Sequence, residues 1–311
     1  MLFRSARLSL SDHRHNLGLN IVHEFCWGIG FAFNDVSTIL PLFLTLLGAP
    51  LSVVGSIAGV FAILMAVPQL ISALMARNIS DIKMATVKVH LTVLPPIFLA
   101  GFVFAFFAPT GPKAWIFYYV CFIFYSLAIG LIIPIWSNFL KHVTKRNNRG
   151  TFLGISFIGN SMGGFIGGIM VKHLLASSIP FPSNFGWGFL ILFVALSIGI
   201  LTYFGFRVKE IDLTQKQRTI QDFIHETKTI LTTNRNFRRY IYSRIFLTAQ
   251  FPAIGLYAVY SRNIFHFDIS EAGLLTAARL VAFGFGSIVA GRIGDKIGHK
   301  AAMRSEERRV G

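Results

Sequence analysis

Eight long apolar runs dominate this sequence of 311 residues. Each run is long enough to form a helix across roughly 30 Å of hydrocarbon, which takes about 20 residues. Only 14% of the residues are charged, whereas soluble globular domains carry about 25%. The sequence therefore predicts an all-α integral membrane protein. The runs cover about 17–47, 51–76, 84–107, 114–140, 151–176, 185–206, 241–262 and 270–291.

The basic residues follow the order of these runs. The N-terminus and the even-numbered loops hold 22 Lys and Arg, whereas the odd-numbered loops hold only Lys113 and Arg262. Cytoplasmic loops are the ones that carry excess Lys and Arg. We therefore expect a multi-pass protein of the plasma or inner membrane with its N-terminus in the cytoplasm. The formal net charge of +16 is then explained by topology and does not point to a nucleic-acid partner.

The sequence divides at its longest polar segment. Residues 1–206 are expected to form a bundle of six helices, and 207–240 a cytoplasmic linker. Mostly apolar residues recur at helical spacing within the linker, namely Ile220, Phe223, Ile224, Thr227, Ile230 and Leu231. This pattern favours an amphipathic helix on the membrane surface over a solvated linker. Residues 241–303 would then begin a second bundle, with helices 7 and 8 and the loop that follows.

A ten-residue motif follows the eighth run: Gly291-Arg292-Ile293-Gly294-Asp295-Lys296-Ile297-Gly298-His299-Lys300. It resembles the G-x-x-x-D-[RK]-x-G-x-[RK] signature of major facilitator superfamily transporters. The resemblance implies that Asp295 caps a neighbouring helix and pairs with the basic residues, while the glycines permit a tight turn. The motif would then bias one state of the transport cycle. The equivalent first-half segment, 73–81, lacks the glycines.

The same resemblance implies a twelve-helix fold of the major facilitator type that works by alternating access. About eight of the twelve helices are present, so we expect this sequence to be a fragment truncated after helix 8, with four further spans encoded beyond codon 303. Residues 304–311, Arg-Ser-Glu-Glu-Arg-Arg-Val-Gly, match the translation of a common sequencing adapter and are expected to be an artefact. These 311 residues alone are not expected to transport.

Ionisable side chains inside spans are costly and are therefore functional candidates. Asp35 is the deepest and could bind a proton or cation; alternatively it pairs with another helix or caps a local break. Arg279 could clamp an anionic substrate or be the partner of Asp35. A helical face carrying Glu24, Trp27, Phe31, Asp35 and Thr38 is expected in the first run. The remaining candidates are His23, Asn34, Tyr125, Gln250 and Tyr257.

These features favour a secondary active transporter, or permease, for a small solute, with protons or another ion as the coupling partner. No cofactor or metal is expected, since Cys26 and Cys121 lie singly in apolar runs without ligand spacing. Two rival functions stay open: an integral-membrane transferase, and a membrane sensor that has this fold but does not transport.

Overall fold

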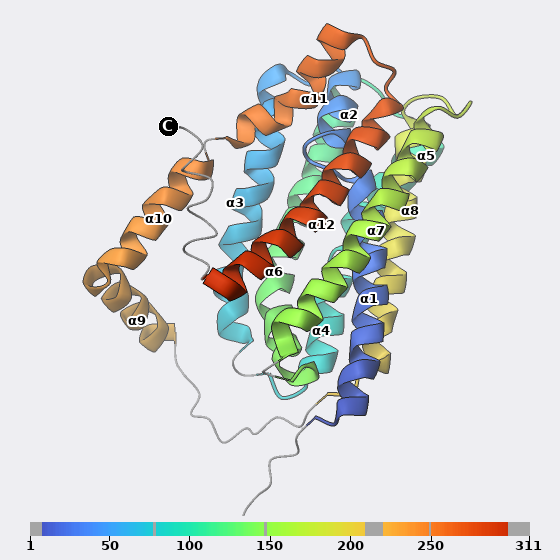
Figure 1. The fold of residues 1–311 in the computed structure, drawn as a ribbon. Coiled ribbons are helices and arrows are strands. Elements are labelled where there is room, and N and C mark those ends of the chain that lie inside the picture. The colour runs from blue at the N-terminus through green and yellow to red at the C-terminus, as the bar shows by residue number, and fades with distance from the viewer. Residues whose placement is uncertain (1–7, 77–78, 146–147, 209–219, 249, 298–311) are drawn as a thin grey trace, which may run out of the picture.

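The computed structural model describes residues 8–76, 79–145, 148–208, 220–248 and 250–297. Throughout these ranges the regular elements are helices (Figure 1). The expected all-α fold is thereby confirmed. Residues 8–208 contain α1 (Leu10–Phe33), α2 (Ile39–Leu46), α3 (Leu51–Met75), α4 (Ile82–Leu91), α5 (Leu94–Phe107), α6 (Pro112–Val143), α7 (Arg149–Leu175), α8 (Ser183–Leu201) and the short 3₁₀ helix η2 (Thr202–Gly205). Residues 220–297 contain α9 (Ile220–Thr233), α10 (Arg235–Thr248), α11 (Phe251–Phe265) and α12 (Glu271–Ile297).

Five helical segments of the described chain are long and apolar enough to cross a membrane. They are α3, α4 with α5, α6, α7, and α8 with η2, and they match five of the eight expected spans. The α4–α5 segment bends at Thr92–Val93. Pro95 and Pro96 explain the bend, because neither can donate a backbone hydrogen bond to the preceding turn.

The first expected span, 17–47, is broken rather than continuous. Helix α1 ends at Phe33 and α2 begins at Ile39, which leaves residues 34–38 outside both helices. Asp35 explains the break, because its side chain accepts hydrogen bonds from the backbone N–H groups of Ser37 and Thr38. Such local side-chain bonds compete with continuation of a helix.

The seventh expected span, 241–262, is also two helices. Helix α10 ends at Thr248 and α11 begins at Phe251. Pro252 lies in the first turn of α11, where its missing N–H is tolerated, but it could not continue α10. Helix α9 lies within the predicted linker, and Figure 1 shows α9 and α10 standing apart from the bundle.

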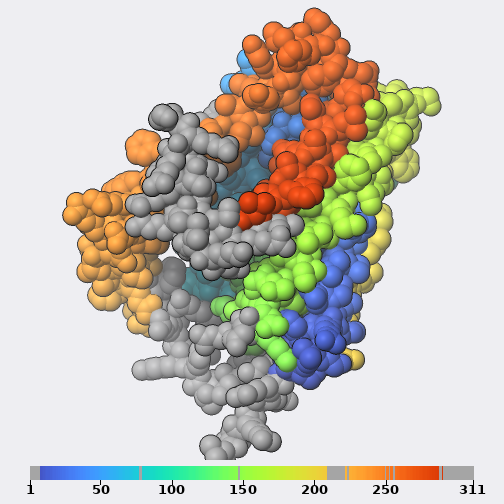
Figure 2. All heavy atoms as spheres, viewed as in Figure 1, coloured from blue at the N-terminus to red at the C-terminus, as the bar shows by residue number. Residues whose placement is uncertain are grey.

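Helices α1 and α7 pack closely because each presents glycine to the other. A Cβ atom at Gly28 would clash with the carbonyl group of Asn160, and one at Gly163 would clash with that of Phe25. Small residues let membrane helices approach at backbone distance. Helix α12 packs antiparallel along α7, from Lys172 beside Glu271 to Ser161 beside Gly284 (Figures 1 and 2).

Replacing Gly163 with leucine is expected to lower thermal stability, because the side chain would force α1 away from α7. Overpacking costs about 1–3 kcal/mol. Cys26 and Cys121 are buried free thiols, so a thiol-reactive dye can follow unfolding. Gly154→Leu on the same helix is the control, since a Cβ there meets nothing within 4 Å. Equal melting temperatures for the two variants would contradict this packing.

Candidate functional site

Asp35 lies at the break between α1 and α2 and is buried, with 4% of the residue exposed. Its Oδ1 atom accepts three hydrogen bonds, from Ser37 N at 2.8 Å, Thr38 N at 3.0 Å and Thr38 Oγ1 at 3.1 Å. These donors all suit an ionised carboxylate. The break therefore frees backbone N–H groups to bond the buried carboxylate, whereas a continuous helix would use them for its own hydrogen bonds.

Arg279 of α12 forms an ion pair with the other carboxylate oxygen, Asp35 Oδ2. One turn earlier on α12, Thr276 Oγ1 lies 2.5 Å from Thr38 Oγ1. Residues three apart share a helix face, so α12 docks on the break through two adjacent polar contacts. We refer to Asp35, Thr38, Thr276 and Arg279 together as the Asp35–Arg279 site.

The two charges of this site differ in exposure. The Asp35 side chain is 1% exposed, whereas that of Arg279 is 45% exposed. A guanidinium carries five N–H donors, and the contact with Asp35 does not use them all. The site thus combines a fixed, buried anion with a cation that keeps donors available to a further acceptor. Of the two sequence alternatives for Arg279, the pairing with Asp35 is the one found.

Glu24 and His23 point to different neighbours. Asn160 of α7 donates from Nδ2 to Glu24 Oε2 at 3.1 Å and to the Glu24 carbonyl oxygen at 3.2 Å. His23 contacts α4 and η2 through His90 and Tyr203. The predicted single face of Glu24, Trp27, Phe31, Asp35 and Thr38 is wrong for its last two members, because α1 ends before them.

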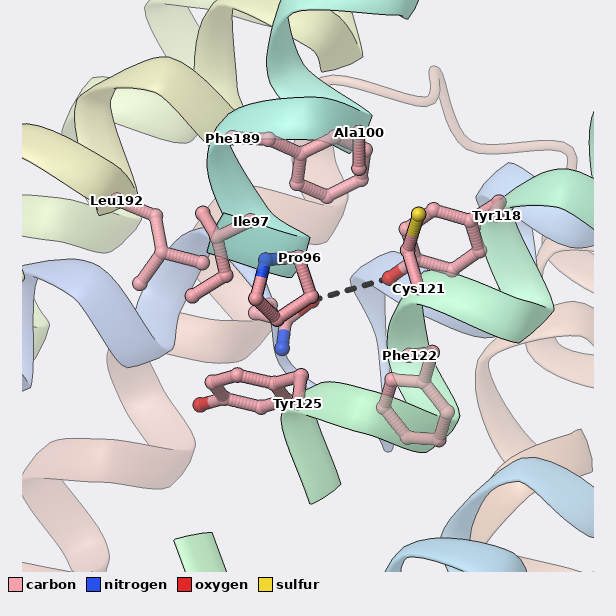
Figure 3. A pocket seen from close by; sticks show the side chains of 10 residues that line it. Pro96, Ile97, Ala100, Tyr118, Cys121, Phe122, Tyr125, Phe189 and Leu192 are labelled. Atoms are coloured by element: carbon pink, nitrogen blue, oxygen red, sulfur yellow. Dashed lines mark hydrogen bonds between the residues drawn. The ribbon is translucent and has the colours of Figure 1, made fainter. Parts of the chain in front are cut away.

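Asn34 and Tyr125 line a narrow, mostly apolar pocket between α5, α6 and α8 (Figure 3). Tyr118 donates its hydroxyl hydrogen to Asn34 Oδ1 at 3.0 Å. This pocket lies within the bundle of residues 8–208, apart from the contact with α12. Trp27 is also internal, with its ring 5.7 Å from His23 and 5.6 Å from His90.

Two further candidates are not brought to the Asp35–Arg279 site. Gln250 precedes α11 and is exposed, and Tyr257 is 72% exposed. The motif expected in a loop after 291 is partly helical, because α12 continues to Ile297. That helix includes Gly291, Arg292, Asp295 and Lys296, whose side chains lie outside the described part of the structure. Gly298, Lys300 and the 304–311 tail lie outside the described residues.

Sequence reasoning missed His90, Tyr203, Asn160 and Thr276. His90 had a usable signal, since it is ionisable and lies within an apolar run. Tyr203 and Thr276 had none, because tyrosine and threonine are ordinary residues at helix ends and within membrane helices. Only the packing of helices distant in sequence reveals their partners.

The segment between α11 and α12 carries its own electrostatic features. Asp268 Oδ1 accepts a hydrogen bond from Ser270 N at 2.8 Å, and hydrogen bonding from Ser270 lowers the pKa of Asp268. Glu271, in the first turn of α12, forms a partly exposed ion pair with Lys172 of α7 at 3.2 Å. These contacts fix the start of α12 beside the end of α7, and so hold Arg279 in register with Asp35.

The comparison with known protein families agrees with this architecture. A sequence model of the Major Facilitator Superfamily matches residues 25–304, which is most of the chain. A search of curated proteins found no match. The chain therefore belongs to the Major Facilitator Superfamily, whose members transport small molecules across membranes.

Proposed function

We propose that this protein is a secondary active transporter that moves a small solute by alternating access, with the Asp35–Arg279 site in its transport path. The single observation that carries the proposal is the ion pair between buried Asp35 and half-exposed Arg279. This ion pair joins the proposed first bundle, residues 8–208, to α12 of the proposed second bundle. Alternating access requires contacts of this kind, which can be made in one state and broken in another.

Ionisable groups within a membrane protein are expensive to keep, which favours a functional role for both members of the pair. When Arg279 separates from Asp35, the carboxylate can take a proton or a cation. The guanidinium can then bind an anionic group on the solute. The pair therefore supports ion-coupled transport. Arrival of a proton or cation at Asp35 would release Arg279 to bind the solute, and binding of the solute at Arg279 would release Asp35.

The packing of α12 supports an orientation as well. Helix α12 contacts the half of α7 that is remote from Arg149, from Ser161 to Lys172. With the N-terminus of the chain in the cytoplasm of a cell, as the distribution of Lys and Arg indicates, these contacts lie toward the outside. We infer that the protein sits in the plasma or inner membrane and that this structure is closed on its outer side.

Uptake into sealed vesicles tests the proposal. Protein expressed from the intact gene would be reconstituted and offered a panel of radiolabelled amino acids, monocarboxylates, sugars and organic cations, with an inward proton gradient. We expect accumulation of one class above empty vesicles. Asp35→Asn should weaken the pH dependence, because asparagine cannot take up a proton, whereas Glu271→Gln, which breaks the exposed pair, should not.

Other outcomes would favour the rival functions or contradict the site. Chemical transfer without solute flux would identify a membrane transferase. Ligand binding without flux or chemistry would identify a sensor. Unchanged, still pH-dependent uptake by Asp35→Asn would remove Asp35 from the coupling mechanism.

A further inference from the structure

A second buried polar cluster joins α1, α4 and η2 through two histidines and a tyrosine. Tyr203 Oη lies 3.1 Å from His23 Nε2 and 2.9 Å from His90 Nε2. All three residues are buried, with at most 3% exposed. We refer to His23, His90 and Tyr203 together as the His–Tyr–His cluster.

The backbone fixes one nitrogen of each ring. His23 Nδ1 lies 3.0 Å from the Gly199 carbonyl oxygen, and His90 Nδ1 lies 2.7 Å from that of Thr86. A carbonyl oxygen only accepts hydrogen bonds, so each Nδ1 must carry the hydrogen and donate it. In a neutral imidazole the other nitrogen, Nε2, is then an acceptor.

The cluster is therefore one hydrogen short when both rings are neutral. The Tyr203 hydroxyl has a single hydrogen, which it can donate to only one Nε2 atom. The second Nε2 lone pair then faces the phenol oxygen at hydrogen-bond distance with no hydrogen between them. One added proton removes this conflict: one ring becomes an imidazolium and donates to Tyr203 Oη, while Tyr203 donates to the other ring.

We propose that the His–Tyr–His cluster binds one exchangeable proton, shared between His23 and His90 through Tyr203, and that it is a proton-coupling site of the transporter. The coupling role rests on the proposed function, whereas proton binding does not. Two added protons are disfavoured, because Tyr203 could not then donate to either ring and two cations would lie side by side in a buried space.

Titratable groups of two neighbouring helices lie near the cluster. Helix α1 contributes Glu24, the residue after His23, whose carboxylate accepts a hydrogen bond from Asn160 of α7. Helix α4 contributes Lys83, whose ammonium donates to the carbonyl oxygens of Phe204 and Phe206, just after Tyr203 in the chain, at 2.6 and 3.1 Å. Helix α8 contributes the Gly199 carbonyl, and α6 contributes the apolar ring of Phe139, 5.2 Å from that of Tyr203.

Two buried asparagines of α1 lie between the cluster and the N-terminal end of this helix. Asn20 is fully buried, and neither of its side-chain amide atoms has a hydrogen-bond partner among the described residues. Buried polar groups of this kind are commonly satisfied by water. Asn20 lies three residues before His23 and four after Asn16, which bonds the carbonyl oxygens of Val143 and Arg207. Asn16 and Asn20 thus place polar side chains between the cluster and the N-terminal end of α1.

Nitrogen NMR of ¹⁵N-histidine-labelled protein in lipid nanodiscs tests proton binding without a solute. The titration would run from about pH 8 down to about pH 4, because burial makes a histidine harder to charge than it is in its usual range. We expect one common step in which the signals of both His23 and His90 shift and together account for one proton. Tyr203→Phe should abolish this common step, because the bridging oxygen is lost. Rings that stay neutral, a charge that does not exchange, or two separate steps would overturn the proposal.

The coupling role has its own test. His90→Gln leaves Tyr203 a single histidine partner, so uptake driven by a proton gradient should be lost while exchange of the same solute at equal pH continues. Dye-monitored melting of each variant establishes folding. Full gradient-driven accumulation by a folded His90→Gln protein would overturn the coupling role. Absence of any flux in the wild-type protein would instead contradict the proposed function and leave the NMR result standing.

Discussion

Replacing Arg279 with glutamine is expected to destabilise the protein by about 2–3 kcal/mol, the largest stability effect among conservative polar substitutions. Removing one partner of a buried ion pair typically costs about 3–5 kcal/mol, because a charge is left buried and unpaired. Here the cost is smaller, because Asp35 keeps its three hydrogen bonds from Ser37 and Thr38. Thermal melting, followed by dye labelling of the buried thiols, measures the loss.

The double variant makes this prediction specific to the ion pair. Asp35→Asn alone should cost less than Arg279→Gln, because half-exposed Arg279 can be solvated when its partner is neutral. Combining both substitutions should recover part of the Arg279→Gln loss, since no buried charge remains. Glu271→Gln is the matched control on the same helix, and exposed pairs contribute only about 0–1 kcal/mol. Additive losses in the double variant would contradict a coupled pair.

Much of the fold could be predicted from local sequence. A run of apolar residues long enough to cross a bilayer is a strong signal, and five of the expected spans are confirmed. The helix at 220–233 followed from the spacing of Ile220, Ile224 and Ile230. The breaks were harder to predict. Residues 34–38 and Gln250 interrupt apolar runs because of single residues, Asp35 and Pro252, which can also occur inside continuous membrane helices.

The charged residues of the candidate site could be predicted from the sequence, but their neighbours could not. Asp35 and Arg279 stood out as charges in apolar surroundings, and their pairing was one of the alternatives stated for each. The sequence could not show that Thr276 meets Thr38, since 238 residues separate them. The His–Tyr–His cluster was hidden for the same reason. His23 was a candidate, but its partners come from α4 and η2, and no local pattern joins these elements.

A reversible crosslink across the Asp35–Arg279 site is expected to stop transport completely. If α12 separates from the α1–α2 break during each cycle, a covalent bond there must hold the protein in one state. Thr38 and Thr276 are suited to this, because their hydroxyl oxygens lie 2.5 Å apart and a disulfide needs about 2 Å between sulfurs. The design is Thr38→Cys with Thr276→Cys, in a background where Cys26 and Cys121 are alanine.

Solute uptake by the crosslinked protein measures most directly whether this contact opens during transport. Uptake would be compared before oxidation, after oxidation and after reduction, with thiol titration to follow crosslinking and each single cysteine as a control. We expect uptake at the level of empty vesicles when the bond is formed, and recovery when it is reduced. Uptake at the full rate by completely crosslinked protein would show that the contact stays closed, and would rule out alternating access through this site.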